Sequence, residues 1–465
     1  MNLFYLRIQI VFLFVLSLCS QQLGMAQAAQ VSFEENHQLP IVYLNVAVKS
    51  GAVSDPKNHL GLTHFMAEML TRGTQKRSKT ELDQALDQMG AKLEVEVRAE
   101  SLILRGAVLS KELPAFLPLI SEVITEPSFN KLEIQRLKSE TISIIQEELG
   151  NDSSLANRKF TEFMFQGHPY GNPILGKKAD IQAITQEQLF SHHKAFFQPQ
   201  LTLIIGSGDC TEDGIQRWAL ELEQKLTALS NAKPDRTTLS QESQTVIAPH
   251  EANHRRLQII DKPDRTQTQI NIGQLGVRMD DPQFFPLHVG NHALGGASFS
   301  ALLMTEIRVK RGWSYGAYSN FRYGLKPRSW QVHLFPAAKD APQALAYTLK
   351  LLEDVKKHGI SEDQFQFAKK SLINSSGFLY NTPRKRIENT LLEKTLNLPT
   401  GYMRSFASQI DRVTFKQVNE ALAQFIKPEH LSISVLSTAS QLKKPLMEAS
   451  KVTENETQIT PYTKE

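Results

Sequence analysis

The stretch ITQEQLFSHHKAFFQPQLTLII (residues 184–205) returns in diverged form as VTFKQVNEALAQFIKPEHLSISV (residues 413–435). Each copy predicts a helix that begins after a threonine, then a turn at a proline, and then an apolar strand. The threonine and the proline have the same spacing in both copies, Thr185 with Pro199 and Thr414 with Pro428. A repeat of this length predicts two copies of one α+β domain.

Each copy also begins with an apolar strand, at Ile41 to Val48 and at Gln269 to Gly273. The fold predicted from this order is α+β, with two homologous domains, each a mainly antiparallel sheet packed by helices, facing each other across a cleft. The predicted divisions are a signal peptide at 1–28, an N-terminal domain at 29–225, a linker at 226–256, a C-terminal domain at 257–438 and a polar, frayed tail at 439–465.

The composition is that of a folded chain with nearly balanced charge. Its 465 residues include 52 Lys and Arg against 48 Asp and Glu, a formal net charge of +4. Domains in a chain of this length bury their own cores without metals or disulfides. The absence of a dense basic stripe argues against nucleic acid as a partner.

The first residues predict export. Arg7 precedes an apolar run at 8–18, and small residues follow at Ala26 and Ala28. This is the pattern of a secretory signal peptide, cleaved near Ala28, and it predicts a periplasmic or secreted protein. The apolar run is about half of the ~20 residues needed to cross a bilayer, so no membrane span is expected.

A lipid anchor at Cys19 is the less favoured alternative, because Leu18 stands where a small residue is expected. After cleavage Cys210 is the only cysteine left, so the mature chain has no internal disulfide.

Two helices carry polar stripes that could be functional. In the helix predicted at 62–70, His64, Ala67 and Glu68 share the face opposite the apolar one. A second predicted helix, at 132–149, places Glu133, Glu140 and Glu147 on one stripe. Taken alone, both stripes are most simply solvated helix faces.

The segment GLTHFMAEMLTRGT (residues 61–74) resembles the signature region of the pitrilysin/insulinase family of zinc peptidases, which includes the mitochondrial processing peptidase. In that family an inverted H-x-x-E-H helix supplies two His ligands and the general-base Glu, and a later segment supplies a carboxylate ligand. The resemblance continues through both repeats, at residues 140–147, 167–176, 294–296 and 308–315.

This sequence departs from the family pattern at the metal helix. His64 matches the first His ligand of the motif, and Glu147 matches the carboxylate ligand. Ala67, however, occupies the position of the general base, and Glu68 occupies the position of the second His ligand. General-base catalysis is worth about 10²–10⁴-fold. The resemblance therefore implies vestigial metal positions at His64, Glu68 and Glu147, no zinc in this chain and no hydrolysis by it alone. An unconventional site of these three residues is the alternative.

In the second repeat, Arg308 and Tyr315 match the family pair that binds the substrate backbone. A guanidinium offers a fork of donors to a peptide carbonyl, and a phenol can donate to a developing oxyanion. Gly312 is expected to end a helix and to place Tyr315 on the next strand. From the residues alone, a helix-capping Arg308 and a Tyr315 packed at a sheet edge are favoured; with the resemblance, the functional assignment leads.

These matches predict a non-catalytic, substrate-binding subunit of a heteromeric periplasmic zinc peptidase that acts on unfolded peptides, with the zinc on a homologous partner subunit. A binding or assembly protein that has lost catalysis, and an autonomous metallopeptidase, are the alternatives. We also expect His192 and His193 to be solvated, and Gly295-Gly296 to connect a strand to a helix.

Overall fold

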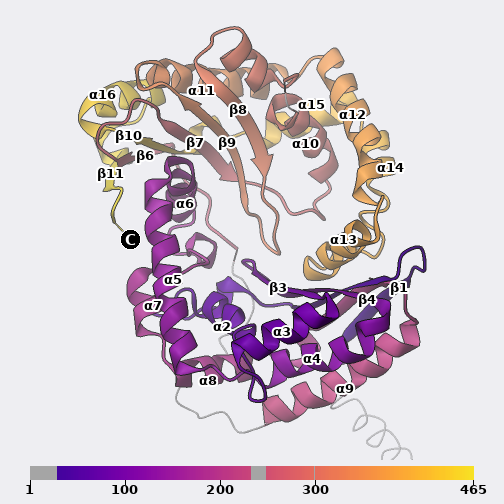
Figure 1. Ribbon diagram of the computed structural model, residues 1–465. Coiled ribbons are helices and arrows are strands. Elements are labelled where there is room, and N and C mark those ends of the chain that lie inside the picture. Colours follow the sequence, from indigo (N-terminus) through magenta and orange to yellow (C-terminus); the bar gives the residue numbers. More distant parts are fainter. Residues whose placement is uncertain (1–28, 232–247, 298, 465) are drawn as a thin grey trace, which may run out of the picture.

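The computed structural model describes residues 29–231, 248–297 and 299–464, and they form two domains, each a sheet covered by helices (Figure 1). The predicted α+β architecture with two repeats is confirmed. The predicted signal peptide, with Cys19, and the middle of the predicted linker lie outside the described residues.

The N-terminal sheet has the strand order β1-β5-β2-β4-β3. β1 pairs parallel with β5, and the other pairs are antiparallel. Its strands are β1 (Gln30–Glu35), β2 (Ile41–Val48), β3 (Lys92–Val97), β4 (Leu102–Leu109) and β5 (Thr202–Gly208). Its helices are α2 (Leu62–Leu70), α3 (Lys79–Met89), α4 (Leu113–Thr125), α5 (Lys131–Gly150), α6 (Asp152–Met164), α7 (Lys178–Ala183), α8 (Gln186–Phe196) and α9 (Glu212–Asn231).

The C-terminal sheet has the order β11-β6-β10-β7-β9-β8, with β11, β6 and β10 parallel and the rest antiparallel. Its strands are β6 (Arg256–Asp261), β7 (Gln269–Leu275), β8 (Ser314–Phe321), β9 (Ser329–Pro336), β10 (Ser432–Ser437) and β11 (Thr457–Pro461). Its helices are α10 (Phe284–Asn291), α11 (Ala341–His358), α12 (Glu362–Ser376), α13 (Pro383–Thr395), α14 (Phe406–Arg412), α15 (Phe415–Phe425) and α16 (Ala439–Ser450), with π-helical turns η5 (His292–Gly296) and η6 (Met304–Val309).

The repeat that predicted the fold has the same local structure in both domains. Thr185 caps α8 and Thr414 caps α15, each in a reciprocal capping box with a glutamine three residues later. The chain then turns at a proline and enters β5 or β10, and both strands are buried along their whole length.

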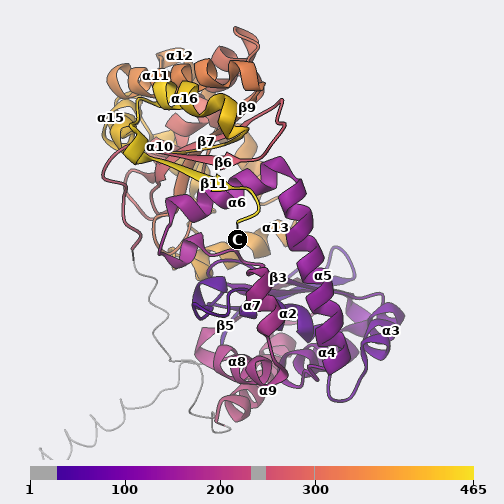
Figure 2. The same ribbon diagram turned by 90° about the vertical axis from the view of Figure 1, so that its left-hand side faces the viewer.

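Each domain packs one of its helices on the sheet of the other domain (Figures 1 and 2). Ile387 and Leu391 of α13 pack with Leu203 and Ile205 of the N-terminal sheet, and the apolar side of α6 packs on the C-terminal sheet through a cluster of buried residues. That second cluster contains Leu155, Ala156, Ile260 and Leu436. Both faces of each sheet are therefore covered, one by its own helices and part of the other by a helix of the opposite domain.

The loop between β8 and β9 is fixed to the N-terminal domain. The buried carboxylate of Glu100, in the turn between β3 and β4, accepts a hydrogen bond of 2.9 Å from the backbone N–H of Leu325 and another from the hydroxyl of Tyr170. Arg328 lies over the Tyr170 ring, with its Cζ 4.8 Å from the centroid. This contact holds the tip of the β8–β9 hairpin against the other domain.

Two predictions on domain organisation were wrong: the start of the linker at residue 226 and the frayed state of the tail. Trp218, Leu222 and Leu226 continue one buried stripe, so α9 runs through Asn231, beyond the predicted boundary at 225. The tail is not frayed, because α16 buries Leu446 and β11 pairs parallel with β6. Among the described helices, none is both long and apolar enough to cross a membrane.

Candidate functional site

Helix α2 is held at its start by a buried carboxylate. Asp55 accepts hydrogen bonds from the N–H of Gly61 (2.7 Å), the N–H of Thr63 (2.8 Å) and the Thr63 hydroxyl (2.5 Å). Burial raises the pKa of Asp55 to about 7 despite these donors. The Thr63 hydroxyl also contacts Nε2 of His192 at 2.9 Å, so that α8 is joined to the start of α2.

The prediction that His192 and His193 are solvated was wrong. Both side chains are buried, and Nε2 of His193 donates to the Ile124 carbonyl at 2.6 Å. Burial lowers the pKa of each to about 4. The two histidines lie on the buried side of α8, together with Leu189 and Phe196, and are part of its packing.

The helix at 62–70 has the predicted bounds, but its polar face is not a solvated one. Ala67 is fully buried, and His64 and Glu68 are partly buried. His64 Nε2 and Glu68 Oε1 are 4.0 Å apart, too far for a hydrogen bond. Burial lowers the pKa of His64 to about 4 and raises that of Glu68, although Arg72 opposes the second shift.

The carboxylates of α5 form ion pairs near α2 instead of supplying a metal ligand, as the family pattern would have it. Glu140 forms an ion pair of 2.5 Å with Arg72, which follows α2, and its negative charge helps to raise the pKa of Glu68. Glu133 is buried and pairs with Arg136 at 2.5 Å. Glu147, which matches the family's third ligand, has an exposed side chain. Ion pairs, which the sequence patterns did not indicate, tie α5 to α2.

These residues do not fit a zinc ion. A hydrolytic zinc site needs three protein ligands and a base. Among residues 29–231, 248–297 and 299–464, no group of three or more His, Cys, Asp or Glu is placed to hold a metal. The buried methyl group of Ala67 cannot take a proton. His64, Glu68 and Glu147 therefore do not come together as a metal centre.

The pair in the C-terminal domain does come together. η6 ends before Gly312, which has a φ of +66°, and Tyr315 lies on β8, as predicted. The Cζ of Arg308 is 4.1 Å from the centroid of the Tyr315 ring. The same Cζ is 4.9 Å from the centroid of Phe299, which the sequence patterns did not single out. Both rings are mostly exposed, on the edge strand of the sheet and on the turn beside it.

A second cluster neutralises the neighbouring cations. Glu306 accepts hydrogen bonds from Lys310 (2.6 Å), Arg311 (2.7 Å) and the Tyr347 hydroxyl (2.8 Å). Burial raises the pKa of Glu306, but these donors outweigh it and lower the pKa to about 2. No such acceptor meets Arg308 within the described part of the chain, so its side chain does not cap the helix end.

The Gly295-Gly296 segment is a π-helical turn after α10, so the predicted connection from strand to helix was wrong. A Cβ on Gly295 would lie 2.5 Å from the backbone nitrogen of Ser319 in β8. Glycine lets this turn, which leads to Phe299, press directly against the strand that carries Tyr315.

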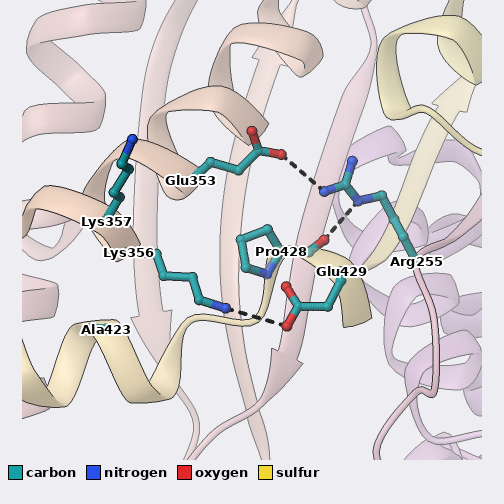
Figure 3. Close-up of a pocket in the computed structure, with 7 residues that line it drawn as sticks. All are labelled: Arg255, Glu353, Lys356, Lys357, Ala423, Pro428 and Glu429. Carbon is teal, nitrogen blue, oxygen red and sulfur yellow. Dashed lines mark hydrogen bonds and ion pairs between the residues drawn. The ribbon is translucent and has the colours of Figure 1, made fainter.

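Two surface pockets lie elsewhere. One of about 600 Å³ is lined by α11, α15 and the turn at Pro428, and its charged groups pair as Arg255 with Glu353 and Lys356 with Glu429 (Figure 3). The other, of about 360 Å³, is lined by residues in the ranges 72–79 and 128–136. Neither contains His64, Glu68, Arg308 or Tyr315.

A duplicated α+β fold with a degenerate metal helix and an Arg/Tyr pair defines a protein of the zinc-peptidase type. Residues 30–178 match the insulinase family (peptidase family M16), and residues 183–372 match the peptidase M16 inactive domain. The chain belongs to the insulinase family.

Similar proteins span nearly the whole chain. The non-peptidase homolog YmxG of Helicobacter pylori is 22% identical, over 92% of this chain and 96% of its own. The crystal structure of a peptidase M16 inactive domain from Pseudomonas fluorescens is 23% identical, with a TM-score of 0.80 over 89% of this chain and 96% of that one. The periplasmic protease PqqL from Escherichia coli is 14% identical, with a TM-score of 0.71 over 91% of this chain and 49% of that one.

Proposed function

We propose that this chain is the non-catalytic, substrate-binding subunit of a heteromeric periplasmic zinc metallopeptidase that acts on unfolded peptides. The single observation that carries the proposal is the contrast within the family motifs. Ala67 and Glu68 remove the base and a ligand from α2, whereas Arg308 and Tyr315 remain together and accessible on the C-terminal domain.

Two comparisons support parts of this proposal. One similar protein is called a non-peptidase homolog, which agrees with loss of catalysis. The part of the periplasmic protease PqqL that aligns with this chain is 49% of its length, which leaves room in that protease for a second unit of similar size. In our proposal the second unit is a homologous subunit with an intact H-x-x-E-H helix, and that subunit holds the zinc.

The test is peptide hydrolysis by the purified mature chain, alone and mixed with a homologous zinc-motif chain from the same organism. We expect turnover by the mixture that exceeds that of the zinc-motif chain alone, and its loss with a chelator. The chain alone should be inactive.

The other outcomes separate the alternatives. Chelator-sensitive hydrolysis by the chain alone would identify an autonomous metallopeptidase. A stable complex whose turnover does not depend on this chain would identify an assembly protein.

A further inference from the structure

The guanidinium of Arg308 lies against aromatic rings and has no acceptor in the described part of the chain. Its Cζ lies over two rings, 4.1 Å from the centroid of Tyr315 and 4.9 Å from that of Phe299. These rings are 72% and 65% exposed. Within the described residues the Arg308 side chain forms no ion pair and no hydrogen bond, so the N–H groups of its guanidinium are free to bind a ligand.

The two cationic side chains that follow Arg308 in the sequence differ from it in having an ion-pair partner. Lys310 and Arg311 both pair with Glu306, at 2.6 and 2.7 Å. Arg308 is partly buried against two aromatic rings, and no carboxylate pairs with it among residues 29–231, 248–297 and 299–464. A cation that has lost part of its hydration and has no counter-ion favours an anionic ligand.

The planar fork of the guanidinium favours one class of anionic ligand, the carboxylate. A peptide carbonyl offers one neutral oxygen, whereas a carboxylate offers two oxygens and the opposite charge, and it matches the guanidinium fork bidentately. The exposed rings provide a surface for an apolar side chain of the peptide.

We infer that Arg308, Phe299 and Tyr315 form a carboxylate-binding site for the peptide substrate. The ligand is either the C-terminal carboxylate of the peptide or an acidic side chain. This inference rests on the proposed function, since it names the substrate group that the Arg/Tyr site takes.

The test is fluorescence anisotropy with one labelled, unfolded peptide in three forms, measured with the chain alone. The forms are a free C-terminal carboxylate, a C-terminal amide, and the amide with one internal Gln replaced by Glu. We expect at least one carboxylate form to bind about tenfold or more tightly than the neutral amide, because bidentate charged hydrogen bonds are strong. The form that gains affinity identifies the source of the carboxylate.

Variants assign the effect to this site. Arg308→Gln should abolish the preference for the carboxylate, and Arg308→Lys, which keeps the charge but not the fork, should retain only part of it. Phe299→Ala should reduce the preference without changing charge. Lys416→Gln removes an 84% exposed cation elsewhere and should leave the preference unchanged. Circular dichroism and thermal melting check that each variant folds.

The remaining outcomes are distinct. Equal binding of all three peptides, weakened throughout by Arg308→Gln, would overturn the carboxylate inference but leave a peptide-binding subunit. A preference that survives Arg308→Gln would also overturn it. If the wild-type chain binds no peptide in any form, the proposed function fails together with the inference.

Discussion

Helix α2 and the segment from η6 to β8 carry the two residue sets that the family resemblance singles out, and the fold uses them differently. On α2, Ala67 is buried, and Arg72 binds Glu140 of α5 where the family has a metal site. In the other segment Arg308 lies between two exposed rings and meets no hydrogen-bond acceptor among the residues that the structure describes. A segment that loses its metal chemistry can become packing, whereas our proposed function assigns a retained role to Arg308.

The largest expected effect comes from the second region. Arg308→Ala should lower kcat/KM of the two-chain assembly about 10²–10³-fold, because it removes charged hydrogen bonds to the peptide substrate that are worth about 1.5–3 kcal/mol each. Steady-state kinetics with size-exclusion chromatography measure turnover and association together. Lys310→Ala removes a nearby cation that is paired with Glu306, and it should change kcat/KM little. Unchanged turnover in Arg308→Ala would remove the assignment of this residue.

The sequence predicted the parts of this comparison that depend on local patterns. The bounds of α2 follow from apolar spacing, and Gly312 places Tyr315 on β8 beside Arg308 because it ends the preceding helix. Contacts between distant segments have no such signal. The pairing of Arg72 with Glu140 depends on how α5 lies on α2.

The sequence patterns also did not predict that α6 and α13 each pack on the sheet of the other domain. α6 and α13 are amphipathic helices whose apolar stripes would look the same on either sheet. β11 was not predicted because the last residues are polar. Its pairing partner, β6, is also far away in the chain, so no local pattern indicates the pairing. Phe299 had no signal other than its place after two glycines.

Protonation of His64 should make its contribution to the free energy of unfolding depend on pH. The pKa of His64 is about 4 in the folded chain and near 6.5 when unfolded, so between these values the unfolded chain binds more protons and stability falls as pH falls. At pH 5 this linkage costs about 2 kcal/mol of unfolding free energy. The change in the free energy of unfolding from pH 7.5 to 5, measured with urea, should therefore be less unfavourable in His64→Gln than in wild type, while the raised pKa of Asp55 contributes equally to both.

His37 provides a control of opposite sign. A hydrogen bond from its ring to Asp209 raises the pKa of this exposed histidine, so its contribution to stability is present in acid and is lost as pH rises. His37→Gln should therefore not reduce the acid sensitivity. Equal acid sensitivity of His64→Gln and wild type would show that His64 is not the neutral, buried group described here.

The smallest effects separate two carboxylates of α5. Glu140→Gln should lower the free energy of unfolding by about 1 kcal/mol or less, because its ion pair with Arg72 is half exposed. Glu147→Gln should change it by less than about 0.5 kcal/mol, since that side chain is exposed. Neither change should affect hydrolysis by the assembly, whose zinc we place on the partner subunit. If Glu147→Gln folded normally but abolished hydrolysis, Glu147 would be a metal ligand after all, and the difference between α2 and the Arg308 segment would disappear.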